Sequence, residues 1–213
     1  MAENISQKKQ RALDIIKIFN EVYGDADCTL DYVDPLQLVI ATQLAAQCTD
    51  ARVNMVTPAL FAKYKTAKDF AEADEKELSD LIRSTGFYRN KTKNIIACGK
   101  KLVEDFNSEV PQTMEELLSL PGVGRKTAYL VLGDAFGIPG IVVDTHAGRL
   151  ARRMGFTKNT DPYKVELDLL KIIPKENQSM FCHQLEFHGR KYCDARRPKC
   201  EKCPVRDICP KLL

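Results

Sequence analysis

Apolar residues recur at three- and four-residue steps through most of this sequence, which is the pattern of amphipathic helices. Two clear examples are Ala12, Ile15, Ile16, Phe19, Val22 and Tyr23, and then Ile95, Ile96, Gly99, Leu102, Val103 and Phe106. Signals of β-structure are scarce, because no segment alternates steadily between apolar and polar residues and no Asn-Gly hairpin occurs. The short run Ile141-Val142-Val143 is best interpreted as a buried connector. The sequence therefore predicts an all-α fold.

Several helix ends are marked by their own chemistry. Asp34-Pro35 and Asp161-Pro162 each combine an N-cap side chain with proline in the first turn, and Thr113 with Glu116 predicts a capping box. Glycines at 86, 137 and 155 are expected helix stops. The turn-forming stretch 137–140 is the best candidate for a domain boundary, since it separates two helical blocks. The first helix could pack with either block.

The composition is that of an ordinary globular protein, with 44% apolar and 29% charged residues in 213. The N-terminal segment has no apolar core for a signal peptide, and no run of about 18 apolar residues occurs, so secretion and membrane insertion are not expected. The net charge of +3 is a weak indication of a polyanionic partner. Residues 188–213 contain eight Lys or Arg against three acids, which a solvated basic tail explains equally well.

A glycine-containing hairpin, Leu120-Pro121-Gly122-Val123-Gly124, lies between the helix that begins at Thr113 and a second apolar helix. Glycines at 122 and 124 permit backbone conformations closed to other residues and let the chain approach a ligand closely. The second helix presents unpaired N–H groups and a positive dipole end, so a phosphate fits there without base recognition. A lone Gly-x-Gly is more often a tight turn. Lys126, near the start of the second helix, favours the phosphate site.

Asp144 follows Lys126 by eighteen residues and stands where an N-cap is expected. Capping by Asp is common and stabilises by about 1 kcal/mol, so capping alone explains the residue. A cap also fixes the position of its carboxylate, however, and capping is therefore compatible with catalysis. His146 is expected to orient or pack, because one histidine without a matched partner specifies little.

The eight cysteines fall into two groups. Four are single residues, mostly in apolar helical stretches, as expected of small buried side chains: Cys28, Cys48, Cys98 and Cys182. The other four lie within 17 residues: Cys193, Cys200, Cys203 and Cys209. In a reducing compartment such a group indicates a metal site, either tetrahedral zinc or an iron–sulfur cubane. Zinc sites usually contain two Cys-x2-Cys pairs, whereas this segment has one, which favours the cluster.

Three motifs in order, LPGVGRKTA, VDTH and the C-x6-C-x2-C-x5-C ending, closely resemble the iron–sulfur type of helix-hairpin-helix DNA glycosylase, the endonuclease III family. The resemblance covers nearly the whole chain, from ATQLAAQCTD at 41–50 through GFYRNK at 86–91 to Cys209. It implies a bifunctional DNA glycosylase and abasic-site lyase that removes oxidised pyrimidines from duplex DNA in base excision repair. The implied chemistry is a lysine Schiff base followed by β-elimination.

The resemblance also implies roles for individual residues. Lys126 matches the family's nucleophile and Asp144 its essential carboxylate. Gln47 and Phe87 match positions whose side chains enter the duplex where the damaged nucleotide is flipped out, although the family often has leucine in place of Phe87. The ligands of a [4Fe–4S] cluster are matched by Cys193, Cys200, Cys203 and Cys209. We expect DNA contacts from the hairpin residues Gly122, Val123, Gly124 and Arg125.

The family fold implies two helical domains. A six-helix domain with the helix-hairpin-helix motif is expected at 28–137, and a second domain with the four-cysteine loop is expected from 1–27 and 138–213. The implied partner is double-stranded DNA that contains damaged pyrimidines or abasic sites. We expect a monomer without membrane contact, associated with the nucleoid in the cytoplasm of a prokaryotic cell.

Other functions are compatible with the same residues. Adenine glycosylases share the cluster but generally lack the equivalent lysine and carry an added C-terminal domain, whereas this chain has Lys126 and ends four residues after Cys209. A thymine-mismatch or pyrimidine-dimer enzyme is harder to exclude. The alternative from another class is a non-enzymatic DNA-binding protein, in which Lys126 would contact phosphate and Asp144 would only cap a helix.

Overall fold

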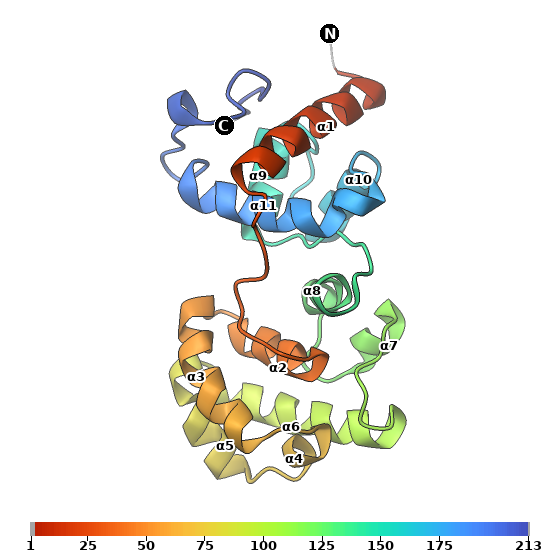
Figure 1. Ribbon diagram of the computed structural model, residues 1–213, viewed down its shortest axis with the longest axis vertical. Helices are drawn as coiled ribbons and strands as arrows, with labels where there is room; N and C mark the ends of the chain where they lie inside the picture. The colour runs from red at the N-terminus through yellow and green to blue at the C-terminus, as the bar shows by residue number, and fades with distance from the viewer. Residues whose placement is uncertain (1–2, 213) are drawn as a thin grey trace. The chain divides into compact units, whose positions relative to one another are not determined.

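The computed structural model describes residues 3–212, which form eleven α-helices and three short 3-10 helices without a strand (Figure 1). The prediction of an all-α fold is confirmed. The predicted connector Ile141-Val142-Val143 is irregular, with Ile141 fully buried. The chain divides into two compact units, one made of Cys28–Ile138 and the other of Met1–Asp27 with Pro139–Leu213. The boundary falls one residue later than the sequence indicates.

The Cys28–Ile138 unit is continuous in sequence. Its elements are α2 (Pro35–Ala45), α3 (Asp50–Lys63), α4 (Ala67–Ala71), α5 (Glu75–Ile82), η1 (Arg83–Thr85), α6 (Tyr88–Asp105), α7 (Met114–Ser119) and α8 (Arg125–Phe136). These are seven α-helices where six were expected, and the five-residue α4 is too short to show a helical period in the sequence. Helix α6 packs against α4 and α5, while α2 packs against α8 (Figure 1).

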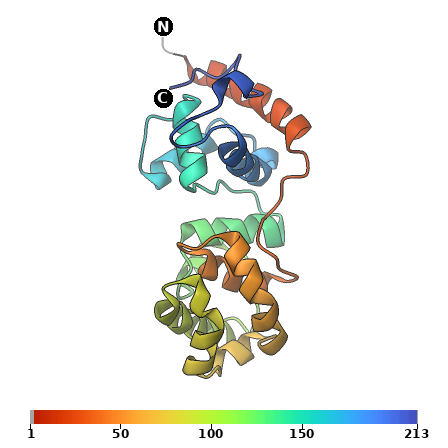
Figure 2. The ribbon, with the colours of Figure 1, turned by 90° about the vertical axis from the view of Figure 1, so that its left-hand side faces the viewer.

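The discontinuous unit joins the two ends of the chain, and its helices are seen from another side in Figure 2. Its elements are α1 (Ile5–Val22), α9 (Thr145–Arg153), α10 (Pro162–Leu170), η2 (Lys175–Asn177), α11 (Gln178–Lys191) and η3 (Cys200–Lys202). Helix α11 packs against α1 and α9. In the core the ring of Phe19 stacks on Phe181, with centroids 5.9 Å apart. The N-terminal helix therefore packs with the C-terminal block.

Most helix ends follow the predicted chemistry. Asp34 and Asp161 each accept a hydrogen bond from a backbone N–H three residues on, with proline in the first turn. Thr113 caps α7 in the same way, but the Glu116 carboxylate accepts a 2.6 Å hydrogen bond from the Thr113 hydroxyl and not from its backbone N–H, so the predicted capping box is only half formed. Gly137 ends α8 with a φ of 65°. These local signals are readable in the sequence because each involves residues within one turn.

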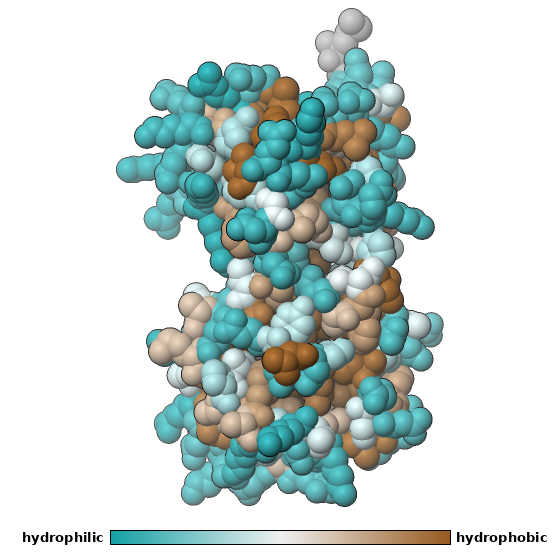
Figure 3. All heavy atoms as spheres, viewed as in Figure 1, coloured by the Kyte–Doolittle hydropathy of each residue, from teal (hydrophilic) through white to brown (hydrophobic). Residues whose placement is uncertain are grey.

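The apolar residues of each unit lie mostly in its interior. Figure 3 shows hydrophilic residues over most of the visible face of the discontinuous unit and around the rim of the Cys28–Ile138 unit, whose middle also carries apolar residues. Among the residues that the structure describes, no helix is long and apolar enough to cross a membrane.

Candidate functional site

The helix-hairpin-helix motif comprises α7, the hairpin 120–124 and α8. Val123 anchors the hairpin, because its side chain is only 7% exposed and belongs to the apolar cluster that contains Leu117 and Ala128. Its backbone N–H donates to the carbonyl of Leu120 at 3.1 Å. The Val123 side chain thus fixes the hairpin to the core.

The two glycines of the hairpin differ in what they require. Gly122 has a left-handed φ of 78°, and a Cβ there would lie 2.7 Å from Gln43 Oε1 and 2.9 Å from Asn94 Cβ. Gly124 has a φ of −100°, which any residue adopts, and no atom lies within 4 Å of a Cβ built on it. The prediction that both glycines need a special backbone conformation is confirmed for Gly122 and wrong for Gly124. Open space at Gly124 instead lets a ligand approach the backbone closely.

Positive charge gathers where α8 begins. The helix starts at Arg125 without a side-chain cap, so its first N–H groups lack this common partner. Arg125 and Lys126 are both exposed in the first turn. The Arg125 guanidinium lies over the Tyr129 ring, 5.5 Å from its centroid. Two cations and the positive end of the helix dipole form the environment that a phosphate prefers.

Asp144 caps α9 as predicted. Its Oδ1 accepts a 2.7 Å hydrogen bond from the N–H of Ala147, which holds the half-buried carboxylate at the helix start. The expected packing role of His146 is also seen, since its Nδ1 lies 3.1 Å from Arg149 Nη2 and 2.5 Å from a Cβ built on Gly189 of α11. Asp144 belongs to the discontinuous unit and Lys126 to the Cys28–Ile138 unit.

Gln47 and Phe87 share an uncommon backbone geometry. Gln47 follows α2 with a φ of 53°, and Phe87 precedes α6 with a φ of 48°. Left-handed φ values are unusual for residues other than glycine, and for a bulky residue they indicate strain. Both side chains are exposed, with 63% of Phe87 accessible to solvent. An exposed aromatic ring on a strained backbone is typical of a contact residue.

The four clustered cysteines line one pocket of the discontinuous unit, together with Arg153, His188 and Tyr192. All four are half-buried. The pKa of the Cys203 thiol is raised to about 11, chiefly by burial and also by the other three thiols, although a hydrogen bond from the Val205 backbone opposes the shift. Thiolates in such a place need compensating positive charge, which a bound metal centre supplies.

The four thiols of Cys193, Cys200, Cys203 and Cys209 line one pocket. Four cysteine thiolates are a donor set that holds an iron–sulfur cluster.

Two donors beside these sulfurs were missed by the sequence analysis. His188 is 1% exposed, and burial lowers its pKa to about 4. Its Nδ1 lies 2.9 Å from the Tyr23 hydroxyl and its Nε2 lies 3.4 Å from Cys203 Sγ. A neutral imidazole has one donor nitrogen and one acceptor, so in the tautomer whose Nδ1 accepts from Tyr23, Nε2–H donates to the sulfur. Arg153 directs its Nη1 at Cys193 Sγ, 3.5 Å away.

Helix α9 also holds the start of the cysteine loop. Arg149 Nε and Nη2 donate to the carbonyl of Cys193 at 3.2 and 3.1 Å. Arg153 donates to the carbonyls of Asp194 and Ala195 at 2.6 and 2.8 Å. The helix that Asp144 caps is therefore bonded at its far end to the segment that carries the first cysteine.

A helix-hairpin-helix motif and a four-thiol pocket in one all-helical chain define an iron–sulfur protein that binds DNA. Residues 40–175 match the HhH-GPD superfamily of base excision DNA repair proteins, and residues 193–209 match the iron–sulfur binding domain of endonuclease III. The endonuclease III of Synechocystis sp. is 52% identical over 211 residues, which are 99% of this chain and 96% of the relative.

Two solved structures are similar over almost the whole chain. A non-covalent endonuclease III–DNA complex has a TM-score of 0.90 at 44% identity, covering 95% of both chains. A trapped endonuclease III–DNA covalent intermediate has the same TM-score and identity, covering 95% of this chain and 96% of that one. This chain therefore belongs to the endonuclease III family within the HhH-GPD superfamily of base excision DNA repair proteins.

Proposed function

We propose that this protein is a bifunctional DNA glycosylase and abasic-site lyase that removes oxidised pyrimidines from duplex DNA. The supporting observation is Lys126, an exposed amine in the first turn of an uncapped helix and two residues after the open Gly124. The chain is also similar to an endonuclease III that was trapped as a covalent intermediate with DNA. An amine beside a phosphate-binding hairpin is well placed to reach the adjoining sugar.

Lys126 acts as the nucleophile in this proposal. The sugar of a stacked base is out of reach, so the nucleotide must first leave the helix at a cost of a few kcal/mol. The free amine attacks C1′, a C–N bond forms, and the base departs with the electrons of the glycosidic bond. Opening of the sugar ring gives a Schiff base; loss of a C2′ proton then expels the 3′ phosphate, and water releases the lysine.

Asp144 stabilises the positive charge that develops on the sugar. A carboxylate that is already bonded to the start of α9 needs little reorganisation when that charge appears. The free amine and the carboxylate thus divide the work between attack and electrostatic stabilisation.

The hairpin binds the phosphates of the DNA, and the exposed side chains of Gln47 and Phe87 open the base stack. Gly122, Gly124 and Arg125 present backbone and charge to phosphate, and Val123 fixes the hairpin to the core. Gln47 and Phe87 enter the stack and keep the gap open after the nucleotide has left it.

The cysteine loop holds a [4Fe–4S] cluster through Cys193, Cys200, Cys203 and Cys209. When bound, the cluster cross-links the loop and so orders its basic residues for contact with phosphate. We assign the helix-hairpin-helix domain to the Cys28–Ile138 unit and the cluster domain to the discontinuous unit. The protein acts as a monomer on nucleoid DNA in the cytoplasm.

A panel of duplexes that differ in one lesion tests this function. Purified protein should release an oxidised pyrimidine and nick its strand, and it should leave the undamaged duplex intact. Preference for an adenine mismatch, a thymine mismatch or a pyrimidine dimer would replace the proposed substrate. Tight binding without base release or nicking would instead support a non-enzymatic DNA-binding protein.

A further inference from the structure

Two exposed segments of the Cys28–Ile138 unit end in strained residues. One follows α2 and ends in Gln47, and the other follows η1 and ends in Phe87. Left-handed backbone at a residue other than glycine persists only where the surroundings hold it there. The immediate neighbours are exposed and give little support, since Ala46 and Gly86 are both accessible to solvent. Something beneath the two segments must hold them.

Lys91 lies beneath both. It belongs to the first turn of α6, and only 5% of its surface is exposed. Its Nζ donates to the carbonyl of Leu44 at 2.7 Å and to the carbonyl of Thr85 at 2.9 Å. Leu44 is in the last turn of α2 and Thr85 is the last residue of η1. One ammonium group thus joins the two helix ends from which the strained segments start.

A cation suits this position. The last carbonyls of a helix have no partner within the helix, and positive charge is favourable at the negative end of the helix dipole. Hydrogen bonds from a charged donor are also stronger than those from a neutral one. Burial lowers the pKa of Lys91, so desolvation opposes the charge that the two carbonyls favour.

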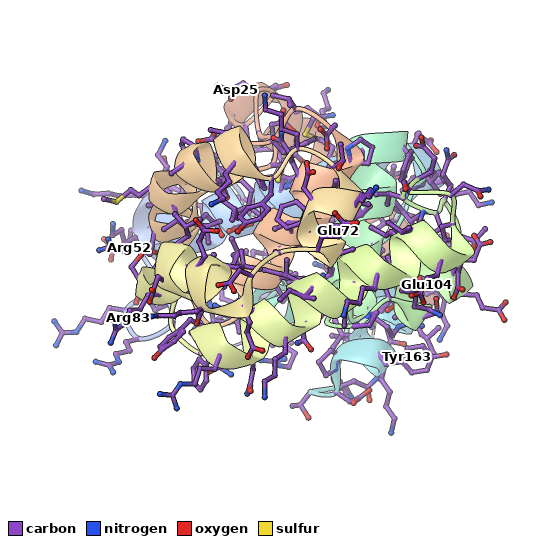
Figure 4. All side chains as sticks on the ribbon, turned by 90° about the horizontal axis from the view of Figure 1, so that it is seen from below. Asp25, Arg52, Glu72, Arg83, Glu104 and Tyr163 are labelled. Carbon is purple, nitrogen blue, oxygen red and sulfur yellow. The ribbon has the colours of Figure 1, made fainter. Side chains whose placement is uncertain are left out.

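We propose that Lys91 is a positioning residue, whose buried ammonium ties the ends of α2 and η1 together and thereby fixes Gln47 and Phe87 for entry into the duplex. This inference rests on the proposed function. Arg52 of α3 and Arg83 of η1, both exposed, extend from the same side of the unit in Figure 4, as expected of a surface that faces DNA phosphates.

The test compares nicking of an abasic site in duplex DNA with nicking of the same strand unpaired. Lys91→Met retains most of the stem and removes the ammonium. We expect the duplex rate to fall by about a hundredfold, as misplacement of a contact residue can do, with a much smaller loss on the single strand. The ratio of the two rates is independent of the amount of folded enzyme, so partial unfolding does not affect it. Lys100→Met removes an exposed charge from the same helix and should leave this ratio unchanged.

A variant that combines three substitutions shows whether Lys91 acts through Gln47 and Phe87. In a Gln47→Ala, Phe87→Ala background, Lys91→Met should lower the duplex rate little further, because the residues that it positions are already lost. Two results would overturn the positioning role. One is an equal loss of nicking rate on the duplex and on the single strand, and the other is the full further loss of the duplex rate when Lys91→Met is added to Gln47→Ala, Phe87→Ala. A wild-type enzyme that nicks neither substrate would overturn the proposed function, and this inference with it.

Discussion

At the scale of the residue, Asp144 caps a helix and has a proposed chemical role, and substitution can separate the two. Asp144→Asn keeps an oxygen that can accept from Ala147, so we expect unfolding free energy to change by no more than about 1 kcal/mol. Turnover should fall about a hundred- to a thousandfold, because the stabilising charge is lost. Chemical denaturation and single-turnover kinetics measure the two effects.

Asp161 provides a matched control for Asp144. It caps α10 in the same way, with its Oδ1 3.0 Å from the N–H of Lys164. Asp161→Asn should therefore have a similar effect on stability and none on turnover. An Asp144→Asn enzyme with the wild-type rate would show that the carboxylate is only a cap.

At the scale of the element, the two hairpin glycines should respond differently to alanine. Gly122→Ala should lower the free energy of unfolding by about 2–4 kcal/mol, since it combines a left-handed φ with a clash against Gln43 and Asn94. Gly124→Ala should change stability by less than about 0.5 kcal/mol, because the added methyl enters open space. The same methyl should weaken DNA binding. Equal destabilisation by both changes would contradict this account of the hairpin.

The elements also show what the sequence can and cannot predict. Caps such as Asp34 and Asp144 and the stop at Gly137 were predicted, because their partners lie within one helical turn. The conformation of Gly124 was not, since its φ depends on how the hairpin packs against the core. Lys91 and His188 were missed because their partners are distant in sequence: Leu44 for Lys91, Tyr23 for His188. The spacing of the cysteines was enough to predict a metal site, whereas the fold was needed to place His188 and Arg153 beside their sulfurs.

At the scale of the whole molecule, the four clustered cysteines and Lys126 lie in different units, so their proposed roles can be tested separately. Purified protein should be yellow-brown, with about four iron atoms per chain and no stoichiometric zinc. Elemental analysis and the visible absorption spectrum measure this directly. A colourless protein with one zinc ion would refute the cluster and leave the role of Lys126 unaffected.

The central claim is that Lys126 forms a Schiff base with the sugar of the damaged nucleotide. Borohydride reduces such a bond and should trap a covalent protein–DNA adduct on duplexes that contain a lesion or an abasic site. Peptide mapping should assign the adduct to Lys126, and Lys126→Gln should abolish it while DNA binding is largely retained, because one lost charge weakens binding only modestly. Trapping that persists in Lys126→Gln, or an adduct that maps to another residue, would contradict the account.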